Sequence, residues 1–153
     1  MQVRFERILP YTPEQLFDVV ADVARYPDFI PYLNSMRVWD RREEGEGRSS
    51  FKAEAQVGYG VFRERFGTLV GLDRPACVVE AYLISGPFHK LENRWKFAPH
   101  EQGSAVDFFV EVKLKSRLLQ AALDANADRA ANKILKGFEA RARRLYGTPA
   151  EAA

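Results

Sequence analysis

The residues that could carry out catalysis or bind a metal are few and lie far apart in the sequence. The single cysteine, Cys77, lies in an apolar segment beside Val78 and Val79, where a buried structural thiol is expected rather than an activated nucleophile. The two histidines, His89 and His100, are expected at opposite ends of one strand, and no cysteine or carboxylate cluster lies near them to complete a zinc site. The sequence also contains no glycine-rich phosphate loop of the usual form and no Gly-x-Ser-x-Gly motif. These observations predict no metal site and favour a binding protein over an enzyme.

Two polar side chains at expected inward positions could contact the polar head of a ligand. Asn93 falls on the same face of a predicted strand as Trp95 and Phe97, and His89 falls on that face too. Glu64 lies among phenylalanines on the inward face of another strand. A buried polar group needs a hydrogen-bond partner, so Asn93 and Glu64 either satisfy each other or a strand end, or they meet a ligand. The sequence leaves both interpretations open.

Length and composition predict one globular domain at residues 1–147, followed by a flexible tail at 148–153. An apolar content of 46% and a charged content of 29% are typical of a globular protein. The formal net charge of +2 gives no general attraction to nucleic acid, so DNA is not an expected partner. A single cysteine suits a reducing compartment, and the chain shows neither a signal-peptide core nor an apolar run of the roughly 20 residues that span a membrane. We therefore expect a cytoplasmic protein.

The N-terminal segment predicts a strand followed by two helices. Residues 3–9 begin with the alternation of apolar and charged residues of a half-buried strand. Thr12, Pro13 and Gln15 then provide an N-cap, a first-turn proline and a capping box, which together mark the start of a helix. Two prolines interrupt the following segment, which predicts a short second helix or an aromatic-rich loop.

Residues 36–115 predict about six antiparallel strands. Runs of roughly ten residues are separated by the turn-forming segments EGEG, VGYG, LDRPA, SGPF and PHEQGS. In the last run, Val106, Phe108 and Val110 are expected to face inward, whereas Asp107 and Glu111 face outward. One face of such a sheet must be covered by another element.

Residues 116–147 predict one long helix that supplies this cover, beginning at Ser116 and ending at Gly147. Its apolar stripe is expected to contain Leu119, Leu123, Ala127, Ala130, Ile134, Phe138 and Leu145. The predicted fold is therefore α+β, with a curved antiparallel sheet wrapped round a long C-terminal helix. The small residues in the middle of the stripe face an aromatic sheet, which either packs densely or leaves an apolar tunnel for a hydrophobic ligand.

Four segments together resemble the coenzyme Q-binding family of START-like domains, which includes polyketide cyclase/dehydrase-like proteins and ribosome-association toxins. These segments are YTPEQLFDVVADVARYPDFIPYL, VGYGVFRERF, SGPFHKLENRWKF and GFEARARRLYG, and they span nearly the whole chain in the family's order. The resemblance implies the helix-grip fold, in which a seven-stranded antiparallel sheet curls round a long C-terminal helix and encloses a hydrophobic tunnel.

The resemblance also implies a function, which is to bind ubiquinone or a related polyisoprenoid lipid in that tunnel and to support respiratory quinone function. It implies two alternatives, a ribosome-associated growth regulator that blocks the joining of ribosomal subunits and a cyclase/aromatase-like enzyme. No cofactor is required for the binding function, although ubiquinone or another lipid is expected as the bound molecule. The expected ligand contacts are Phe29, Tyr32, Phe51, Phe62, Glu64, Phe66, Asn93, Trp95, Phe97, Phe108, Val110, Leu123, Ala127, Ile134 and Phe138.

Two surface features could contact partners larger than a small-molecule ligand, such as a membrane or the ribosome. The segment DFIPYL, at residues 28–33, is expected either to form an exposed lip that touches a membrane or to plug one end of the barrel. A set of cations on the outer face of the C-terminal helix, here called the basic ridge, is expected to be a solvated face, with weak attraction to anionic lipid or to RNA as the alternative. It consists of Arg129, Lys133, Lys136, Arg143 and Arg144. The expected partners are thus a quinone or lipid, transient contact with the inner membrane and, in the alternative, the ribosome.

Overall fold

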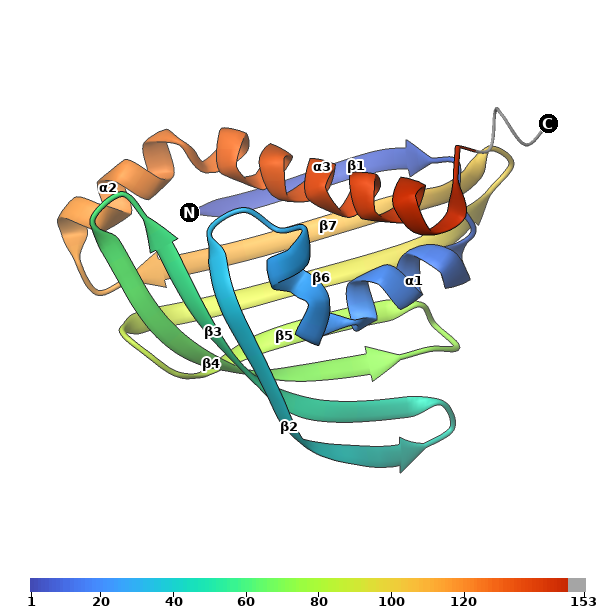
Figure 1. Ribbon diagram of the computed structural model, residues 1–153, viewed down its shortest axis with the longest axis horizontal. Helices are drawn as coiled ribbons and strands as arrows, with labels where there is room; N and C mark the ends of the chain where they lie inside the picture. Colours follow the sequence, from blue (N-terminus) through green and yellow to red (C-terminus); the bar gives the residue numbers. More distant parts are fainter. Residues whose placement is uncertain (149–153) are drawn as a thin grey trace.

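In the computed structural model, seven strands form one antiparallel sheet that curls round the C-terminal helix (Figure 1). The structure describes residues 1–148, apart from the side chains of Tyr59 and Phe62, so that the predicted tail lies outside the described residues except for Thr148. The strands are β1 (Gln2–Leu9), β2 (Leu33–Gly45), β3 (Arg48–Tyr59), β4 (Phe62–Asp73), β5 (Val78–Ser85), β6 (Phe88–His100) and β7 (Gly103–Leu114). The helices are α1 (Pro13–Ala21), the 3-10 helix η1 (Val23–Asp28), α2 (Arg117–Ala125) and α3 (Ala127–Tyr146). This arrangement confirms the predicted α+β helix-grip fold.

The strand order in the sheet is β1-β7-β6-β5-β4-β3-β2, so β2 to β7 form a meander and β1 pairs with the last strand. Each of the five predicted turn segments joins two neighbouring strands, as expected. Glycine is required in the turn between β5 and β6, where Gly86 has a φ of 133° and a Cβ atom would lie 2.7 Å from the Cβ atom of Phe66. This close approach fixes the β5–β6 turn against the start of β4.

Helix α1 begins at the predicted capping box. The Thr12 side chain accepts a hydrogen bond from the Gln15 backbone N–H, and the Gln15 side chain accepts one from the Thr12 backbone N–H, at 3.1 and 2.9 Å. The buried residues of this helix are Pro13, Leu16, Phe17, Val19 and Val20. The predicted short second helix is η1, which contains Pro27.

The prediction of one continuous C-terminal helix is wrong at Asn126, where α2 ends and α3 begins. The Asn126 side-chain amide donates a hydrogen bond to the Ala122 carbonyl oxygen at 2.9 Å, and its backbone N–H donates to the Leu123 carbonyl oxygen at 3.1 Å. Asn126 itself has left the helical conformation, with φ −119° and ψ 13°. An asparagine side chain that bonds to the nearby backbone competes with the helical hydrogen bonds, which accounts for the interruption.

The buried face of α3 is also rotated relative to the predicted stripe. Its fully buried residues are Ala131, Leu135, Phe138 and Ala142. Ala127, Ala130 and Ile134 are only half-buried, and Leu145 is exposed. Phe138 is the member of the predicted stripe that reaches the centre of the core.

The core lies in the half of the sheet that α1 and α3 cover. Trp95 is 3% exposed, and its ring centroid lies 4.6 Å from that of Phe108 and 4.7 Å from that of Phe138. The cavity enclosed at this place has a volume of about 20 Å³, which is close to the space needed for one water molecule. This half, here called the closed half, is therefore densely packed and leaves no room for a lipid.

Candidate ligand-binding site

The inner-face side chains change from buried to half-buried along the length of the sheet. In β7, Val106 and Phe108 are buried, whereas Val110 and Val112 are half-buried. The same change occurs between Trp95 and Asn93 in β6, between Thr68 and Phe66 in β4, and between Ala55 and Val57 in β3. Because neighbouring strands are antiparallel and paired in register, these changes all lie toward the same end of the sheet.

This end of the sheet, here called the open end, lies opposite α2 and the first turns of α3. It is defined by half-buried inner-face residues, which are Val57, Glu64, Phe66, Leu91, Asn93, Val110 and Val112 of the sheet and Leu119, Leu123, Ala127, Ala130 and Ile134 of the helices. Most of these side chains are apolar, and their incomplete burial leaves apolar surface between the sheet and the helices. An apolar lining with a small number of polar groups is typical of a site for a hydrophobic small molecule.

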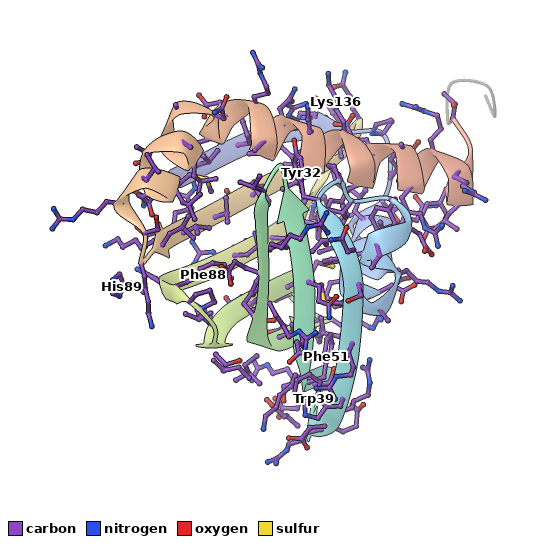
Figure 2. The ribbon with its side chains drawn as sticks, turned by 60° about the vertical axis from the view of Figure 1, so that its left-hand side comes forward. Tyr32, Trp39, Phe51, Phe88, His89 and Lys136 are labelled. Atoms are coloured by element: carbon purple, nitrogen blue, oxygen red, sulfur yellow. The ribbon has the colours of Figure 1, made fainter. Side chains whose placement is uncertain are left out.

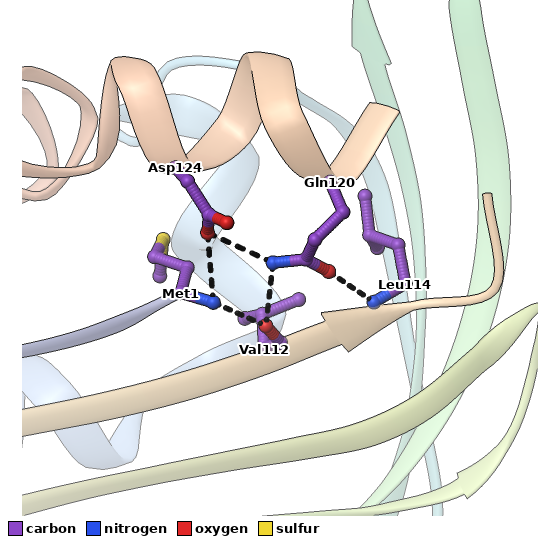
Figure 3. Close-up of polar contacts among 5 residues, drawn as sticks. All are labelled: Met1, Val112, Leu114, Gln120 and Asp124. Carbon is purple, nitrogen blue, oxygen red and sulfur yellow. Dashed lines mark hydrogen bonds and ion pairs between the residues drawn. The ribbon is translucent and has the colours of Figure 1, made fainter. Parts of the chain in front are cut away.

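Helix α2 covers the open end without packing tightly on it. Within the described chain, none of its residues is fully buried. The Gln120 amide instead donates hydrogen bonds to the Val112 carbonyl oxygen and to Asp124, at 3.3 and 2.9 Å, and accepts one from the Leu114 N–H at 2.6 Å (Figure 3). The amino group of Met1 lies 3.0 Å from Asp124 and donates to the Val112 carbonyl oxygen, and hydrogen bonds from this group and from Gln120 hold the pKa of Asp124 below its usual range. Polar contacts centred on Gln120 therefore hold α2 against β7.

Replacing Gln120 with alanine is expected to loosen α2 while the rest of the fold stays intact. Each lost hydrogen bond contributes about 1 kcal/mol, so hydrogen-exchange protection of the amides in residues 117–125 should fall about tenfold or more. The matched control is Gln102→Ala in the β6–β7 turn, because Gln102 donates to the His100 side chain from its backbone N–H, which the substitution keeps. Unchanged protection of α2 in the Gln120 variant would show that another contact holds this helix.

The structure divides the predicted ligand contacts into two groups. Those at the open end are Glu64, Phe66, Asn93, Val110, Leu123, Ala127 and Ile134. Tyr32 belongs with them because its carbonyl oxygen accepts a hydrogen bond from the N–H of Gly58, near the end of β3, at 2.9 Å. Those packed in the core are Phe51, Trp95, Phe97, Phe108 and Phe138, with Phe29 beside them. The side chain of Phe62 lies outside the described part of the chain.

The polar candidates occupy different surroundings. Asn93 donates a hydrogen bond from its amide to the Phe109 carbonyl oxygen at 2.9 Å, which links β6 to β7, so its partner is a strand backbone. Glu64 is half-buried on the inner face and pairs in register with Val57. The inward position predicted for His89 is wrong, because a bulge between Phe88 and Lys90 shifts the register of β6. Figure 2 shows His89 pointing away from the molecule, and its side chain is exposed.

The bulge places Phe88, rather than His89, against the sheet interior. Phe88 is buried, and its ring centroid lies 5.1 Å from that of Phe66. This aromatic pair links the start of β6 to the start of β4 at the open end. The inward position of Phe88 was not predicted, because it depends on the bulge, and the alternation of residues in the sequence does not reveal that bulge.

The other groups that could do chemistry are used structurally. The Tyr26 hydroxyl donates a hydrogen bond to the Val20 carbonyl oxygen, and burial raises the pKa of Tyr26 far above its ordinary value. Burial also raises the pKa of the Cys77 thiol, whose sulfur donates to the Arg74 carbonyl oxygen at 3.5 Å. Among residues 1–148, no group of three or more His, Cys, Asp or Glu side chains is placed to hold a metal ion. Glu64, by contrast, is a half-buried carboxylate on the inner face at the open end.

The two predicted surface features also have clear positions. Ile30 is buried, and the Phe29 ring centroid lies 5.3 Å from that of Phe138, so the segment 28–33 plugs the barrel and does not form an exposed lip. The five cations of the basic ridge are exposed and make no ion pair with the described acidic residues. None of the described helices is long and apolar enough to cross a lipid bilayer.

The sequence of this chain is similar to those of several other proteins. Residues 9–139 match the family described as polyketide cyclase / dehydrase and lipid transport. The ribosome association toxin RatA of Pseudomonas aeruginosa is 34% identical over 141 residues, which cover 92% of this chain and 94% of that protein. The mitochondrial coenzyme Q-binding protein COQ10 homolog B of Xenopus laevis is 30% identical over 146 residues, which cover 92% of this chain and 57% of that protein.

Solved structures show the same fold. The solution structure of an 18 kDa protein from Caulobacter crescentus is 44% identical and superposes with a TM-score of 0.82 over 97% of this chain and 99% of that chain. The Zhui aromatase/cyclase from Streptomyces sp. R1128 superposes with a TM-score of 0.76 over 95% of each chain, and at 15% identity this likeness concerns the fold alone. Because the family match covers most of the chain, this chain belongs to the polyketide cyclase / dehydrase and lipid transport family.

Proposed function

We propose that this protein binds a hydrophobic ligand, ubiquinone or a related polyisoprenoid lipid, at the open end and thereby supports respiratory quinone function. The observation that carries the proposal is the set of half-buried apolar side chains between the sheet and α2–α3, next to a closed half that is densely packed. The family description includes lipid transport, and one relative is named as a coenzyme Q-binding protein. These comparisons support a lipid-like ligand for the apolar surface at the open end.

The apolar surface suits an isoprenoid tail, and two polar side chains suit its head group. Each methylene group that is buried contributes about 0.8 kcal/mol, so a long tail gains affinity without specific chemistry. Glu64 offers a carboxylate acceptor on the inner face of β4. Asn93 uses one amide N–H for the Phe109 carbonyl oxygen, and its side-chain amide has a second N–H to donate.

Native mass spectrometry of the purified protein, followed by organic extraction of the bound molecules, tests this proposal. We expect an isoprenoid quinone or another isoprenoid lipid in a one-to-one complex. Protein that purifies empty is then titrated with decylubiquinone, a soluble short-chain ubiquinone, and is expected to bind one molecule. A protein that carries no lipid and does not bind decylubiquinone would contradict the proposal.

A second candidate function is association with the ribosome, and two observations favour it. The similarity to the toxin RatA covers 92% of this chain, and the basic ridge presents exposed cations that could contact RNA. Charge reversal at Lys136 and Arg143 should then abolish co-sedimentation with ribosomes and leave decylubiquinone binding intact. The matched control reverses the same number of charges at Arg42 and Arg48, which lie on β2 and β3. Ribosome binding that survives reversal of the ridge would contradict this second function.

The cyclase/aromatase-like alternative would need an acid or a base beside the ligand. Glu64 has the required position, whereas His89 points outward and the Tyr26 hydroxyl is bonded to the Val20 carbonyl oxygen. The Zhui aromatase/cyclase is 15% identical to this chain, so its likeness supports the fold and not the reaction. No observation at the site favours catalysis over binding.

A further inference from the structure

We propose that the open end is a docking surface for an anionic lipid bilayer, from which the ligand passes directly into its site. This inference rests on the proposed function and adds the partner surface that the ligand would come from. Three connections surround the open end, namely residues 60–61 between β3 and β4, 86–87 between β5 and β6, and 115–116 between β7 and α2. Antiparallel pairing places all three at the same end of the sheet, on the left-hand side of Figure 1.

One exposed apolar side chain lies in or within two residues of each of these connections. Val61 is 100% exposed in the β3–β4 turn, Leu118 is 81% exposed in the first turn of α2, and Ile84 is 47% exposed just before the β5–β6 turn. A single exposed apolar residue needs no explanation, but three that surround one apolar site form a shared feature of that end. Isolated apolar side chains of this kind suit shallow insertion among lipid head groups.

Cations lie beside these apolar side chains. Lys113, Lys115 and Arg117 are exposed around the β7–α2 connection, and Arg63 is exposed next to the β3–β4 turn. None of the four makes an ion pair with an acidic side chain of residues 1–148. Each such cation strengthens binding to an anionic membrane surface by about fivefold.

One lysine, Lys90, partly neutralises two acidic side chains at the open end. Glu111 forms an ion pair with Lys90, and hydrogen bonding to this lysine lowers the pKa of Glu111. Glu92 lies 3.9 Å from the same lysine, and Glu64 faces the interior. The positive charge of the unpaired cations therefore dominates this end.

The β2–β3 turn at the other end of the sheet is locally acidic, whereas the far end of α3 carries the cations Arg143 and Arg144. The β2–β3 turn carries the exposed acidic residues Glu43, Glu44 and Glu46. An anionic bilayer would repel the three glutamates of this turn and attract the cations of the open end, which favours an orientation with the ligand site toward the lipid. Charge complementarity and exposed apolar side chains thus coincide at the mouth of an apolar site, which favours a lipid surface over a protein or RNA partner.

Vesicle co-sedimentation tests this inference, with phosphatidylcholine vesicles that contain or lack phosphatidylglycerol. The wild-type protein is expected to bind the vesicles that contain phosphatidylglycerol. The double variant Lys115→Glu/Arg117→Glu should bind them at least about tenfold more weakly, because two attractive charges become repulsive. Leu118→Ser should also weaken binding several-fold through the loss of apolar insertion.

Two matched controls lie at the far end of α3. Arg143→Glu/Arg144→Glu reverses the same number of charges on the basic ridge, and Leu145→Ser changes a leucine that is 51% exposed. Both controls should retain vesicle binding. Equal loss in Arg143→Glu/Arg144→Glu would place the membrane contact on the basic ridge and overturn the inference, as would vesicle binding that Lys115→Glu/Arg117→Glu leaves unchanged.

Titration with decylubiquinone in the absence of vesicles separates this inference from the proposed function. The variants Lys115→Glu/Arg117→Glu and Leu118→Ser change no residue of the ligand site. They should bind decylubiquinone as the wild-type protein does, with unchanged circular dichroism. A wild-type protein that binds decylubiquinone but no anionic vesicle would overturn the docking surface and leave the proposed function standing. A protein that binds neither would overturn both.

Discussion

Replacing Trp95 with alanine is expected to lower the free energy of unfolding by about 3–5 kcal/mol, the largest effect on stability that we predict. The Trp95 ring contacts Phe108, Phe138 and Phe97 at the centre of the closed half. Because the cavity already present there is only about 20 Å³, truncation would leave a void that its neighbours cannot fill without rearrangement. Urea denaturation followed by far-UV circular dichroism measures the loss.

Trp39 provides the control for this change, since it is the other tryptophan of the chain. Trp39 is half-buried in β2, and the Arg37 guanidinium lies 4.2 Å from its ring centroid. Its replacement by alanine should remove mainly that contact, at a cost of about 1 kcal/mol. A Trp95 variant as stable as the Trp39 variant would mean that the closed half is loosely packed. We therefore assign Trp95 to the core and expect its loss to impair folding before it impairs ligand binding.

Replacing Val110 with aspartate is expected to weaken decylubiquinone binding by about 10- to 100-fold, the largest effect on ligand affinity that we predict. Val110 lies on the inner face of β7 at the boundary between the closed half and the open end. A carboxylate there would have to be desolvated when the ligand covers it, and burial of an unpaired polar group costs about 1–3 kcal/mol. Titration of the folded variant with decylubiquinone measures the change.

The matched variant for Val110→Asp is Leu69→Asp on β4. Leu69 is exposed on the outer face of the same sheet, so this substitution adds the same charge away from the ligand site. Its affinity for decylubiquinone should equal that of the wild-type protein. If the Val110 variant folds normally and keeps full affinity, the ligand does not bind at the open end.

Short-range sequence signals predicted most of the fold because they act locally. The turn segments rich in glycine and proline determined where each strand ends, and the capping box at Thr12 and Gln15 determined where α1 begins. The alternation of Val106 and Phe108 with Asp107 correctly predicted which face of β7 is buried. These features depend on neighbouring residues and on a period of two, which the sequence displays directly.

The predictions from the sequence were wrong where a single residue changes the backbone geometry without changing the pattern of apolar and polar residues. Asn126 ends α2 through bonds from its own side chain and backbone, although asparagine also occurs inside helices. The bulge at the start of β6 exchanges the positions of Phe88 and His89, and a shift of one residue moves a side chain to the opposite face. Both features alter which residues face the site while leaving the order of elements intact.

The division between the closed half and the open end could not be predicted from the sheet alone. A period of two places Trp95, Asn93 and Val110 on the inner face, but it does not show how far along each strand the cover extends. The extent of this cover is determined by where α1 packs on the sheet and by the position of the break between α2 and α3. The aromatic residues therefore belong mainly to the core, and the smaller and polar ones remain at the open end.

The central claim, that the open end binds a hydrophobic ligand, is tested most directly by intermolecular nuclear Overhauser effects between decylubiquinone and methyl-labelled protein. The expected contacts are with the methyl groups of Val110, Leu123 and Ile134, whereas Val19 and Val20 in the closed half should show none. Contacts with Val19 and Val20, or a bound ligand that contacts none of the open-end methyl groups, would contradict this account.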